Sequence, residues 1–323
     1  MKEIRKESSL KIKTEQIKQI GYRLGFHKVG IARPQKLPHS EDLLTWLLSG
    51  KHGTMHYMEK YLDKRLDIRQ LYPPVRSVIV VAHNYYTPFQ RKHDKHYAKI
   101  SRYAWGKDYH MVIKKKLKHY LTELKKLDTE IEGRLFVDTA PVQERLWAVA
   151  AGLGWQGKNT NLISRDLGSF LFLGVLLINR VLVYDRPIQN YCGSCTACIE
   201  ACPTEALQPY ELDARRCLSY LTIEYWNAPI PEALADKMNN WVFGCDICQD
   251  VCPWNRFARP TDENNYAPVD PRLVNPPLTW LASLSEEEFR TVFKKTPVMR
   301  AKYANFMRNV KTVLAHIKKA AAK

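Results

Sequence analysis

The sequence predicts an α+β protein that combines a mixed sheet and flanking helices with a small cysteine-rich module and a short basic helical tail. Strand-like apolar runs alternate with helical patterns in the first half of the chain, and all eight cysteines lie between Cys192 and Cys252. The segment from Arg290 to Lys323 has ten Lys or Arg and no acid. With 323 residues, of which 45% are hydrophobic, the chain can bury one large core and a smaller one. We therefore expect an α/β core over residues 1–185, the cysteine-rich module over 186–258, and a proline-rich linker with the basic tail over 259–323.

The core is expected to begin with a helix and a strand. Thr14 stands where a helix N-cap would, because apolar residues recur behind it at helical spacing, and residues 29–32 form a short apolar strand. A second helix is expected over residues 40–48. Val75 to Ala82 is β-branched and almost uninterrupted, which indicates a strand buried on both faces.

A basic and aromatic segment follows this strand. Residues 91–126 include twelve Lys or Arg and three acids. Within them, the loop 101–110 interleaves aromatic rings with cations, a composition that suits base stacking together with phosphate contacts. The loop leads into a long basic helix that should end near Leu127. For the lysines at 114–118, an ordinary solvated helix face is the better interpretation.

An acidic residue, Asp138, comes directly after the next expected strand, residues 135–137. Open α/β sheets present groups to their ligands at the carboxyl ends of strands. Asp138 could instead cap the helix expected over residues 142–151, but Thr139 could do so equally well. This leaves Asp138 free for another role.

Residues 152–160 place three glycines and several polar groups in nine positions. Phosphate-binding glycine loops follow a strand, whereas this segment follows a helix, so neither the P-loop nor the dinucleotide pattern fits. The glycines would instead let the backbone approach a large flat ligand closely. Two further strands are expected beyond this segment, at 170–178 and 181–183.

The cysteines have the spacing of iron–sulfur ligands. Residues 192–203 read C-x2-C-x2-C-x3-C-P, the run by which two-cluster bacterial ferredoxins hold [4Fe–4S] cubes, and eight thiolates match the needs of two cubes. The second run, which ends at Cys252, lacks its first cysteine, so only the lone Cys217 can supply the missing ligand. Because the fourth cysteine of each run ligates the other cluster, the spacing divides the ligands into two sets. Cluster 1 receives Cys192, Cys195, Cys198 and Cys252, and cluster 2 receives Cys202, Cys217, Cys245 and Cys248.

Disulfides and structural zinc are the alternative uses of these cysteines. The sequence shows no secretory signal peptide, and a chain of this size and apolar content does not need disulfides for stability. Tetrahedral zinc sites normally take two ligands from each knuckle, so they leave a third cysteine followed by x3-C-P unexplained. Iron–sulfur chemistry is therefore the better prediction.

Charge separates the cysteine-rich module from the rest of the chain. The whole chain carries +17, but nine acids and three bases between Cys192 and Cys252 give that stretch −6, so the remainder carries +23. The basic body favours a polyanionic partner, although the charge alone is equally compatible with a role in solubility. The acidic module would face a basic patch on an electron carrier.

The tail is expected to be basic and helical, since apolar residues recur from Phe293 to Leu314 at roughly helical spacing. Its apolar face would dock on the body and its basic face would stay available for nucleic acid. The longest apolar run of the chain, Phe170 to Ile178, is shorter than the ~18 residues that a transmembrane helix needs. We expect a cytoplasmic protein without a membrane association, in a compartment where thiolates stay reduced.

Several motifs resemble those of the epoxyqueuosine reductases, cobalamin-dependent iron–sulfur enzymes that complete queuosine synthesis on tRNA. The resemblance runs from about residue 15 to about residue 310, and the cysteine array with its lone Cys217 is the most specific part. Family members commonly continue into a longer helical-repeat tail that helps to grip the tRNA, whereas this chain stops soon after residues 306–309. Besides the cysteines, the matching motifs are Leu24-Gly-Phe26, Val29-Gly-Ile-Ala-Arg33, His52-Gly-Thr-Met55-His-Tyr57-Met58, Ile100-Ser-Arg-Tyr-Ala104, Gly106-Lys-Asp-Tyr-His110, Asp138-Thr-Ala-Pro141, Gly152-Leu-Gly-Trp155 and Gly157-Lys158.

This resemblance implies a reaction and a set of site residues. The reaction is the reduction of epoxyqueuosine to queuosine at the wobble position of tRNA, a two-electron deoxygenation at a cobalamin, in its cob(II)alamin state, fed by two [4Fe–4S] clusters. Asp138 is the implied proton donor, with a pKa raised by burial against the corrin and apolar walls. No D-x-H-x-x-G motif is present, so a histidine ligand on cobalt is not expected. Corrin contacts are expected from Met55, Tyr57, Asp138, Thr139, Lys158, Asn159 and Thr160, and substrate contacts from Arg102, Tyr103, Asp108, Tyr109 and His110.

The implied partners are the anticodon stem-loop of a tRNA and a low-potential electron donor that the sequence does not identify. A monomer is expected, because no long apolar seam suggests a dimer. One alternative is a corrinoid reductive dehalogenase, although residues 1–13 show no twin-arginine leader of the kind that usually precedes those enzymes. Another is a non-catalytic ferredoxin fused to an RNA-binding body, which would have no need of cobalamin.

Overall fold

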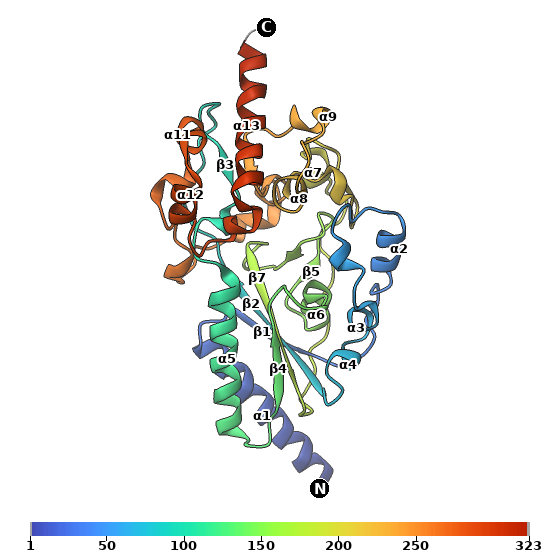
Figure 1. Cartoon of the computed structure of the whole chain (residues 1–323). Helices are drawn as coiled ribbons and strands as arrows, with labels where there is room; N and C mark the ends of the chain where they lie inside the picture. The colour runs from blue at the N-terminus through green and yellow to red at the C-terminus, as the bar shows by residue number, and fades with distance from the viewer. Residues whose placement is uncertain (1, 322–323) are drawn as a thin grey trace.

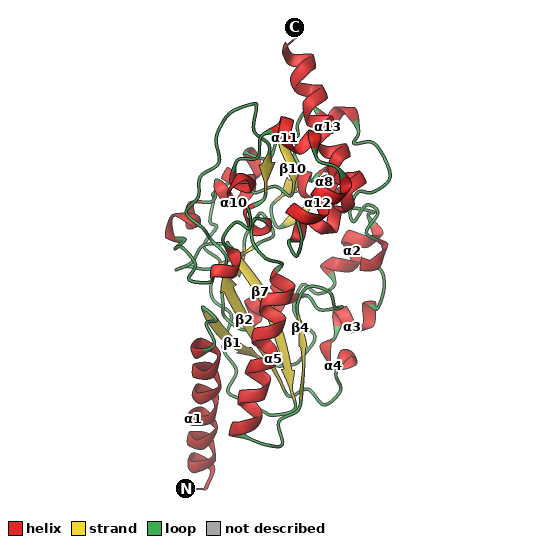
Figure 2. Cartoon of the chain, turned by 60° about the vertical axis from the view of Figure 1, so that its left-hand side comes forward, coloured by secondary structure: helices red, strands yellow, loops and turns green. Residues whose placement is uncertain are grey.

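The chain folds into two adjoining parts, one built on a sheet and one on the cysteine-rich module with the C-terminal helices (Figures 1 and 2). The computed structural model describes the backbone of residues 2–321 and the side chains of residues 10–319. The helices are α1 Lys2–Arg23, α2 Asp42–Leu48, α3 Leu62–Leu66, α4 Ile68–Leu71, α5 Tyr109–Leu127, α6 Glu144–Ala150, α7 Ala197–Glu200, α8 Leu218–Ile223, α9 Glu232–Ala235, α10 Ile247–Asp250, α11 Leu278–Ser283, α12 Glu286–Val292 and α13 Lys302–Ala321. The strands are β1 Lys28–Ala32, β2 Ser77–Asn84, β3 Lys99–Ile100, β4 Gly133–Phe136, β5 Trp155–Gln156, β6 Leu162–Ile163, β7 Leu171–Ile178, β8 Leu207–Gln208, β9 Glu211–Leu212 and β10 Trp241–Phe243.

The main sheet has the strand order β1-β2-β7-β4, and each neighbouring pair in it is antiparallel. The α+β class is confirmed, but the expected mixed sheet is wrong for these four strands. The continuous apolar sequence of β2 suggested parallel neighbours because parallel strands are usually covered on both faces. Here helices cover both faces of an antiparallel sheet, with α1 and α5 packed on one face and α6 on the other. A parallel pair occurs in the separate two-stranded sheet of β3 and β10.

Residues of β2 alternate between two hydrophobic cores, as the two-residue period of a strand requires. Ile79 and Val81 lie in the core beneath α1 and α5, whereas Val78 and Val80 lie in the core beneath α6. All eight residues of β2 are buried. β4 belongs to the same sheet, and its carboxyl end points toward the second part of the molecule (Figure 1).

Three local expectations in this half are corrected. Thr14 lies inside α1 and does not begin it; its Oγ1 donates to the Leu10 carbonyl at 2.7 Å and accepts from the Val183 amide at 3.0 Å. Residues 181–183 form no strand, because their amides bond to side chains such as Ser77 Oγ and not to a neighbouring strand. The helix after Asp138 is shorter than expected, and neither Asp138 nor Thr139 caps it.

The basic tail is largely helical, as expected, and consists of the end of α12, a 3-10 turn at Pro297–Ala301 and α13. Pro297 has no amide proton to extend α12, which ends before it. The apolar face of α13 docks on the cysteine-rich module: Phe306 and Val310 share a core with α8 and β10. Asn309 is fully buried, and its Nδ2 donates to the carbonyls of Thr222 and Val242, both at 2.9 Å. The last two residues of the expected tail, 322 and 323, lie outside the described residues.

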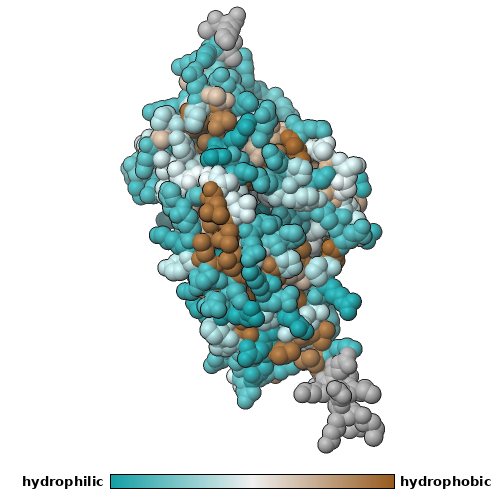
Figure 3. Space-filling view, turned by 90° about the vertical axis from the view of Figure 1, so that its right-hand side faces the viewer, coloured by the Kyte–Doolittle hydropathy of each residue, from teal (hydrophilic) through white to brown (hydrophobic). Residues whose placement is uncertain are grey.

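No helix in the described part of the chain is long and apolar enough to cross a membrane. The face drawn in Figure 3 is mostly hydrophilic, and its hydrophobic areas form separate patches. The helices α1 and α13 project from opposite ends of the molecule (Figure 1).

Candidate functional site

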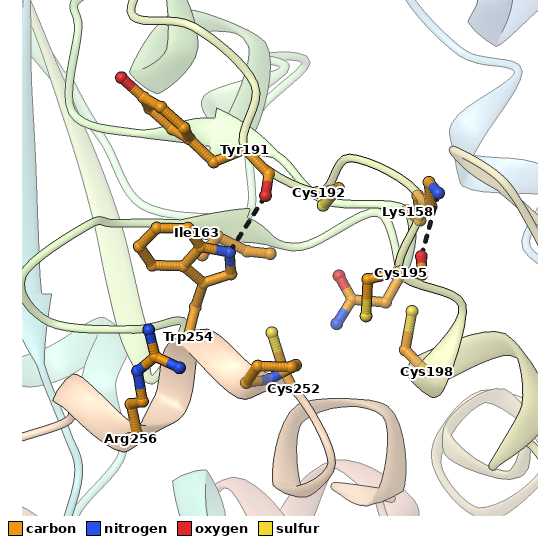
Figure 4. Close-up of a pocket in the computed structure, with 11 residues that line it drawn as sticks. Lys158, Ile163, Tyr191, Cys192, Cys195, Cys198, Cys252, Trp254 and Arg256 are labelled. Atoms are coloured by element: carbon orange, nitrogen blue, oxygen red, sulfur yellow. Dashed lines mark hydrogen bonds between the residues drawn. The ribbon is translucent and has the colours of Figure 1, made fainter.

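The four cysteines assigned to cluster 1 line a single cavity of about 260 Å³. Cys192 and Cys195 come from the loop that leads into α7, Cys198 lies in α7 itself, and Cys252 follows α10; Figure 4 shows the four around the same space. Lys158, Trp254 and Arg256 complete much of the wall. Cys195 is exposed, while the other three are half-buried.

The cysteines assigned to cluster 2 form a second group, deeper in the protein. Burial raises the pKa of Cys217, Cys245 and Cys248, and the neighbouring thiols, including Cys202, add to these shifts. Cys217 and Cys245 pack against the core formed by α8, β10 and α13. Cys202 Sγ accepts a hydrogen bond from the Ala206 amide at 3.4 Å. Each predicted set of four is thus brought together.

Both sets fit a [4Fe–4S] cube in the chemistry of their donors. Each supplies four thiols, and none of the eight is in a disulfide. Backbone amides lower the pKa of Cys217, Cys245 and Cys252 against the opposing effect of burial, so these thiols sit where amide dipoles stabilise negative charge. Amide hydrogen bonds of this kind tune cubane clusters.

A buried ion-pair network fixes α10, and with it Cys248, to the sheet half of the molecule. Asp246 is 1% exposed and pairs with Arg91, which also reaches Asp250 at 3.1 Å. The Asp246 carboxylate also accepts from the Ser101 hydroxyl and from the Arg102 amide. Burial and the nearby charge of Asp246 raise the pKa of Asp250 to about 6.

The second candidate site is centred on Asp138, just beyond the end of β4. Asp138 has a positive φ of 57°, a left-handed conformation that few residues other than glycine adopt readily. Its amide donates to Glu144 Oε1 at 3.0 Å, which holds this conformation at the start of α6. Strained backbone of this type is common at functional sites.

The Asp138 carboxylate is held by two side chains at the start of α5. Tyr109 donates its hydroxyl proton to Asp138 Oδ2 at 2.7 Å, and His110 Nε2 lies 3.2 Å from the same oxygen. Asp108 caps α5 and contacts the other ring nitrogen, His110 Nδ1, at 2.7 Å. The Tyr109 ring is stacked between Phe172 and the His110 ring.

These contacts set the protonation of the pair. Burial opposes the charging of His110, but hydrogen bonds to Asp108 and Asp138 outweigh it and raise the pKa of His110 to about 9. Burial also acts to raise the pKa of Asp138, but the His110 and Tyr109 contacts bring it below its ordinary value. In the chain by itself the pKa of Asp138 is therefore lowered, and the raised pKa that is expected when a corrin lies against it stays a prediction.

Glu144 and Arg145, neither of which was expected at the site, show that Asp138 faces a recess. Burial and the charge of Asp138 raise the pKa of Glu144 to about 8. The side chain of Arg145 is exposed to solvent, yet desolvation by the surrounding protein lowers its pKa. The side chain of Asp138 is likewise 63% exposed, although desolvation by the surrounding protein acts on its pKa. Desolvation by neighbouring protein combined with exposure to solvent is what side chains in a surface recess would show, and we call the surroundings of Asp138, Glu144 and Arg145 the recess.

Tyr57 and Arg300 stand at the edge of this recess. Burial is the main cause that raises the pKa of Tyr57 to about 12, and charges on Glu224, Arg300 and Asp138 also act on it. The Arg300 guanidinium lies 5.9 Å from the centre of the Tyr57 ring and forms an ion pair with Glu224. Met55, two residues earlier, is half-buried against the C-terminal core. Arg300 carries no local sequence signal, because a basic residue in a basic tail is unremarkable.

The segment 157–160 joins the recess to both cysteine sets. Lys158 Nζ donates to the carbonyls of Gly193 and Cys195 at 2.7 and 3.0 Å (Figure 4 shows the Cys195 bond), and Asn159 Nδ2 donates to the Cys248 carbonyl at 3.0 Å. The Thr160 carbonyl accepts from Arg145. The structure thus places Lys158 and Asn159 against the cysteine loops, and Thr160 beside the recess. Thr139 is exposed next to Asp138.

The expected position of Arg102 at the substrate mouth is wrong. Arg102 is 5% exposed, its guanidinium donates to the carbonyls of Thr87 and Phe89, and it stacks on three aromatic rings. The alternation of cations and rings that suggested base stacking instead forms an internal cation–π cluster. Tyr103 is half-buried and packs against Phe172 and Phe243.

The fold and the eight grouped cysteines define an iron–sulfur oxidoreductase of the double-cluster type. A family model described as "4Fe-4S double cluster binding domain" matches residues 191–255, and one described as "Epoxyqueuosine reductase QueG, DUF1730" matches residues 65–139. The chain belongs to the epoxyqueuosine reductase family. It is 45% identical over 306 residues to the epoxyqueuosine reductase of Cyclobacterium marinum, which covers 94% of this chain and 97% of that protein. The enzyme from Synechocystis sp. is 48% identical over 85% of this chain and 95% of its own length.

Solved structures of the family have the same fold. A crystal structure of epoxyqueuosine reductase with an epoxyqueuosine-modified stem-loop of tyrosine tRNA is 30% identical with a TM-score of 0.86, covering 95% of this chain and 82% of that one. A structure of the Bacillus subtilis enzyme, described with its catalytic aspartate loop swung out of the active site, is 28% identical, also with a TM-score of 0.86 and with the same shares covered. Relatives differ in length: this chain covers 83% of the Pseudomonas aeruginosa enzyme, which is 43% identical over 92% of this chain.

Proposed function

We propose that this protein reduces epoxyqueuosine in tRNA to queuosine. The observation that carries the proposal is the hydrogen-bonded pair of Asp138 and His110 on the floor of a recess that segment 157–160 connects to two sets of four cysteines. Converting an epoxide into an alkene breaks two C–O bonds and releases the oxygen as water, which consumes two electrons and two protons. A proton source and an electron supply must therefore meet in one place.

The proton is proposed to pass through Asp138. His110 is protonated at neutral pH, and its Nε2 lies 3.2 Å from Asp138 Oδ2. As a substrate fills the recess and excludes water, the charge-separated pair loses its hydration, which favours transfer of the proton to Asp138. Asp138 then donates it to the departing oxygen, and Tyr109 keeps the carboxylate oriented through its hydroxyl.

A cobalamin is proposed as the group that fills the rest of the recess. The fit rests on an opening deep enough to desolvate Arg145 and wide enough to leave it exposed. Tyr57 and Met55 would line one side, and Thr139 and the backbone of Thr160 the other; Lys158 and Asn159 would reach it only by leaving the cysteine loops. When bound, it supplies a metal centre that can collect two electrons for the reaction.

The two cysteine sets are proposed to deliver these electrons one at a time. Cluster 2 is the inner one, since burial acts strongly on Cys217, Cys245 and Cys248, whereas Cys195 of cluster 1 is exposed. Cluster 1 lies beyond it, with Cys195 at the surface. Crossed ligation from the two runs keeps the cubes close enough for transfer between them.

The tRNA stem-loop is proposed to approach over basic surfaces at the mouth of the recess. Arg300 is at its edge, and its charge also acts on Asp138. The lysines of α5 and α13 add positive charge on either side. Phosphate contacts of this kind make binding fall steeply with salt, by about 0.7 log units per log salt for each contact.

Anaerobic purification tests the whole assignment. Absorption spectra and metal analysis should give roughly eight irons per chain, as two cubes require, together with a corrin after reconstitution with cobalamin. Single-turnover assays with an epoxyqueuosine-modified anticodon stem-loop should then yield queuosine. Full occupancy of both clusters and of the corrin with no product from the stem-loop would contradict the proposed reaction.

A further inference from the structure

The electron donor must approach one of the two cysteine sets, and the one exposed cysteine among the eight, Cys195, belongs to the cluster 1 set. Cys195 of the cluster 1 set is exposed and lines a cavity with Tyr191, Trp254 and Arg256. The cluster 2 cysteines Cys217 and Cys245 are packed against the C-terminal core. Cluster 1 is therefore the point of electron entry in the proposed two-cluster path, on which this inference rests.

Most acids of the module are paired with basic side chains once the chain is folded. Of its nine acids, eight are paired with cations, several of them from distant parts of the chain, and Glu200 is hydrogen-bonded to Thr196. The pairs are Glu205–Arg216, Glu211–Lys51, Asp213–Arg215, Glu224–Arg300, Glu232–Lys319, Asp236–His316, and Asp246 and Asp250 with Arg91. This pairing weakens the case for the basic carrier that the sequence suggests, and the charge of the carrier stays a prediction.

The cations around the cluster 1 cavity are left unmatched. Lys158 and Arg256 line the cavity, and the Arg165 guanidinium lies 5.9 Å from the centre of the Tyr191 ring in its wall. Among the described residues, none of these three forms an ion pair with a carboxylate; Lys158 contacts only carbonyl oxygens, and Arg256 lies over the Phe257 ring. Arg165 and Arg256 are both exposed. The one open cluster site thus has a cationic rim.

Apolar side chains are interspersed with this rim. Tyr191 lines the cavity and is 39% exposed, and Phe257, which lies beneath the Arg256 guanidinium, is 38% exposed. Partly exposed apolar groups ringed by like charge are typical of a surface that meets a partner briefly and releases it, as an electron carrier requires. Opposite charge on the partner would steer its encounter.

We propose that the surface formed by Arg165, Tyr191, Arg256 and Phe257 is the docking site for an acidic one-electron carrier protein, with a flavin or iron–sulfur centre, that reduces cluster 1. Each encounter oxidises the carrier by one electron and reduces cluster 1 by one electron. Two encounters supply one turnover.

The test uses the cluster-loaded protein and a photoreduced acidic flavodoxin as the probe. Bleaching of the cluster absorption is followed by stopped flow at several salt concentrations, for wild type and for the double variant Arg165→Glu/Arg256→Glu. We expect the second-order rate at low salt to fall by roughly tenfold or more and its decrease with salt to vanish. The matched control, Lys114→Glu/Lys118→Glu, makes the same charge change on exposed residues of α5 and should lower the rate much less.

Two further measurements separate the possible outcomes. Iron content and bleaching by dithionite should be unchanged in the rim variant; if wild type itself fails to bleach with dithionite, the two-cluster path and not the docking site is wrong. Binding of the tRNA stem-loop should also be unchanged. An unaltered flavodoxin rate, an equal loss in both double variants, or lost stem-loop binding with an unaltered flavodoxin rate would overturn the proposal, the last by making the rim an RNA contact.

Discussion

The two chemical centres of this protein are built in opposite ways. The cysteine-rich module takes all eight thiols from one stretch of sequence, residues 192–252, and its geometry follows from their spacing. The Asp138 recess draws on separate segments that only the complete fold brings together. Its members are Tyr57, Asp108, Tyr109, His110, Asp138, Glu144, Arg145, Thr160 and Arg300.

In the proposed reaction the cysteine-rich module supplies the electrons and the Asp138 recess supplies the proton. Substitution of one cluster ligand should remove the whole cluster, because four thiolates hold each cube. A residue of the recess acts through hydrogen bonds and pKa values, so its loss is graded. Substitutions in the module should therefore change the metal content, whereas substitutions in the recess should change the rate and its pH dependence with the metal intact.

The largest effect is expected from Cys217→Ala. The substitution removes one of four ligands of cluster 2, so iron should fall from roughly eight to roughly four per chain and turnover should become undetectable. Iron analysis with electron paramagnetic resonance of the reduced protein checks this result. Ser219→Ala, two residues further along, is a suitable control, and full iron content in Cys217→Ala would show that the cluster assignment is wrong.

Asp138→Asn should lower turnover by about 10²- to 10⁴-fold, the usual contribution of a general acid, without any loss of iron or of bound corrin. The amide keeps the size of the side chain but cannot carry the proton. Single-turnover kinetics on the modified stem-loop measure the change. In the same variant the pKa of His110 should fall from about 9, because one of the two carboxylates that raise it is gone. A variant with wild-type turnover would remove Asp138 from the reaction.

The sequence predicted local features, such as those of the cysteine-rich module, better than features that depend on the complete fold, such as the Asp138 recess. Apolar periodicity located β1, β2, β7 and α5, because this signal is local, whereas the division of the cysteines into two ligand sets by their spacing stays a prediction. The pairing of the strands is not local, so their antiparallel order was missed. Arg102 was misassigned because alternating rings and cations look alike at a surface and in an internal cluster. Glu144 and Arg145 became visible only when the left-handed turn at Asp138 placed them on the recess floor. The three-part division of the chain remains a prediction.

His110→Gln should lower turnover by about 10- to 100-fold, at the lower end of general acid–base contributions, because Asp138 would still donate but would lose its proton reserve. For wild type, His110 carries its proton below a pH of about 9 and loses it above, so turnover should decline as pH rises through 9. This alkaline decline should be absent from the variant. A pH profile of single-turnover rates distinguishes the two, and an identical decline in both proteins would assign it to another group.

The smallest effect on turnover is expected from Glu144→Gln. Burial raises the pKa of Glu144 to about 8, so the wild-type side chain is mostly neutral at pH 7, and glutamine keeps the oxygen that accepts from the Asp138 amide. A carboxyl group whose pKa is higher in the folded protein than in the unfolded chain destabilises the folded protein as the pH rises. The loss begins near pH 4.5, the pKa in the unfolded chain, and is complete above the pKa in the folded protein. The variant lacks this loss, so its thermal midpoint should match wild type near pH 4.5 and exceed it increasingly up to about pH 8. Equal midpoints at both ends of this range would mean that Glu144 is already charged in the folded protein, and would place a second carboxylate beside Asp138.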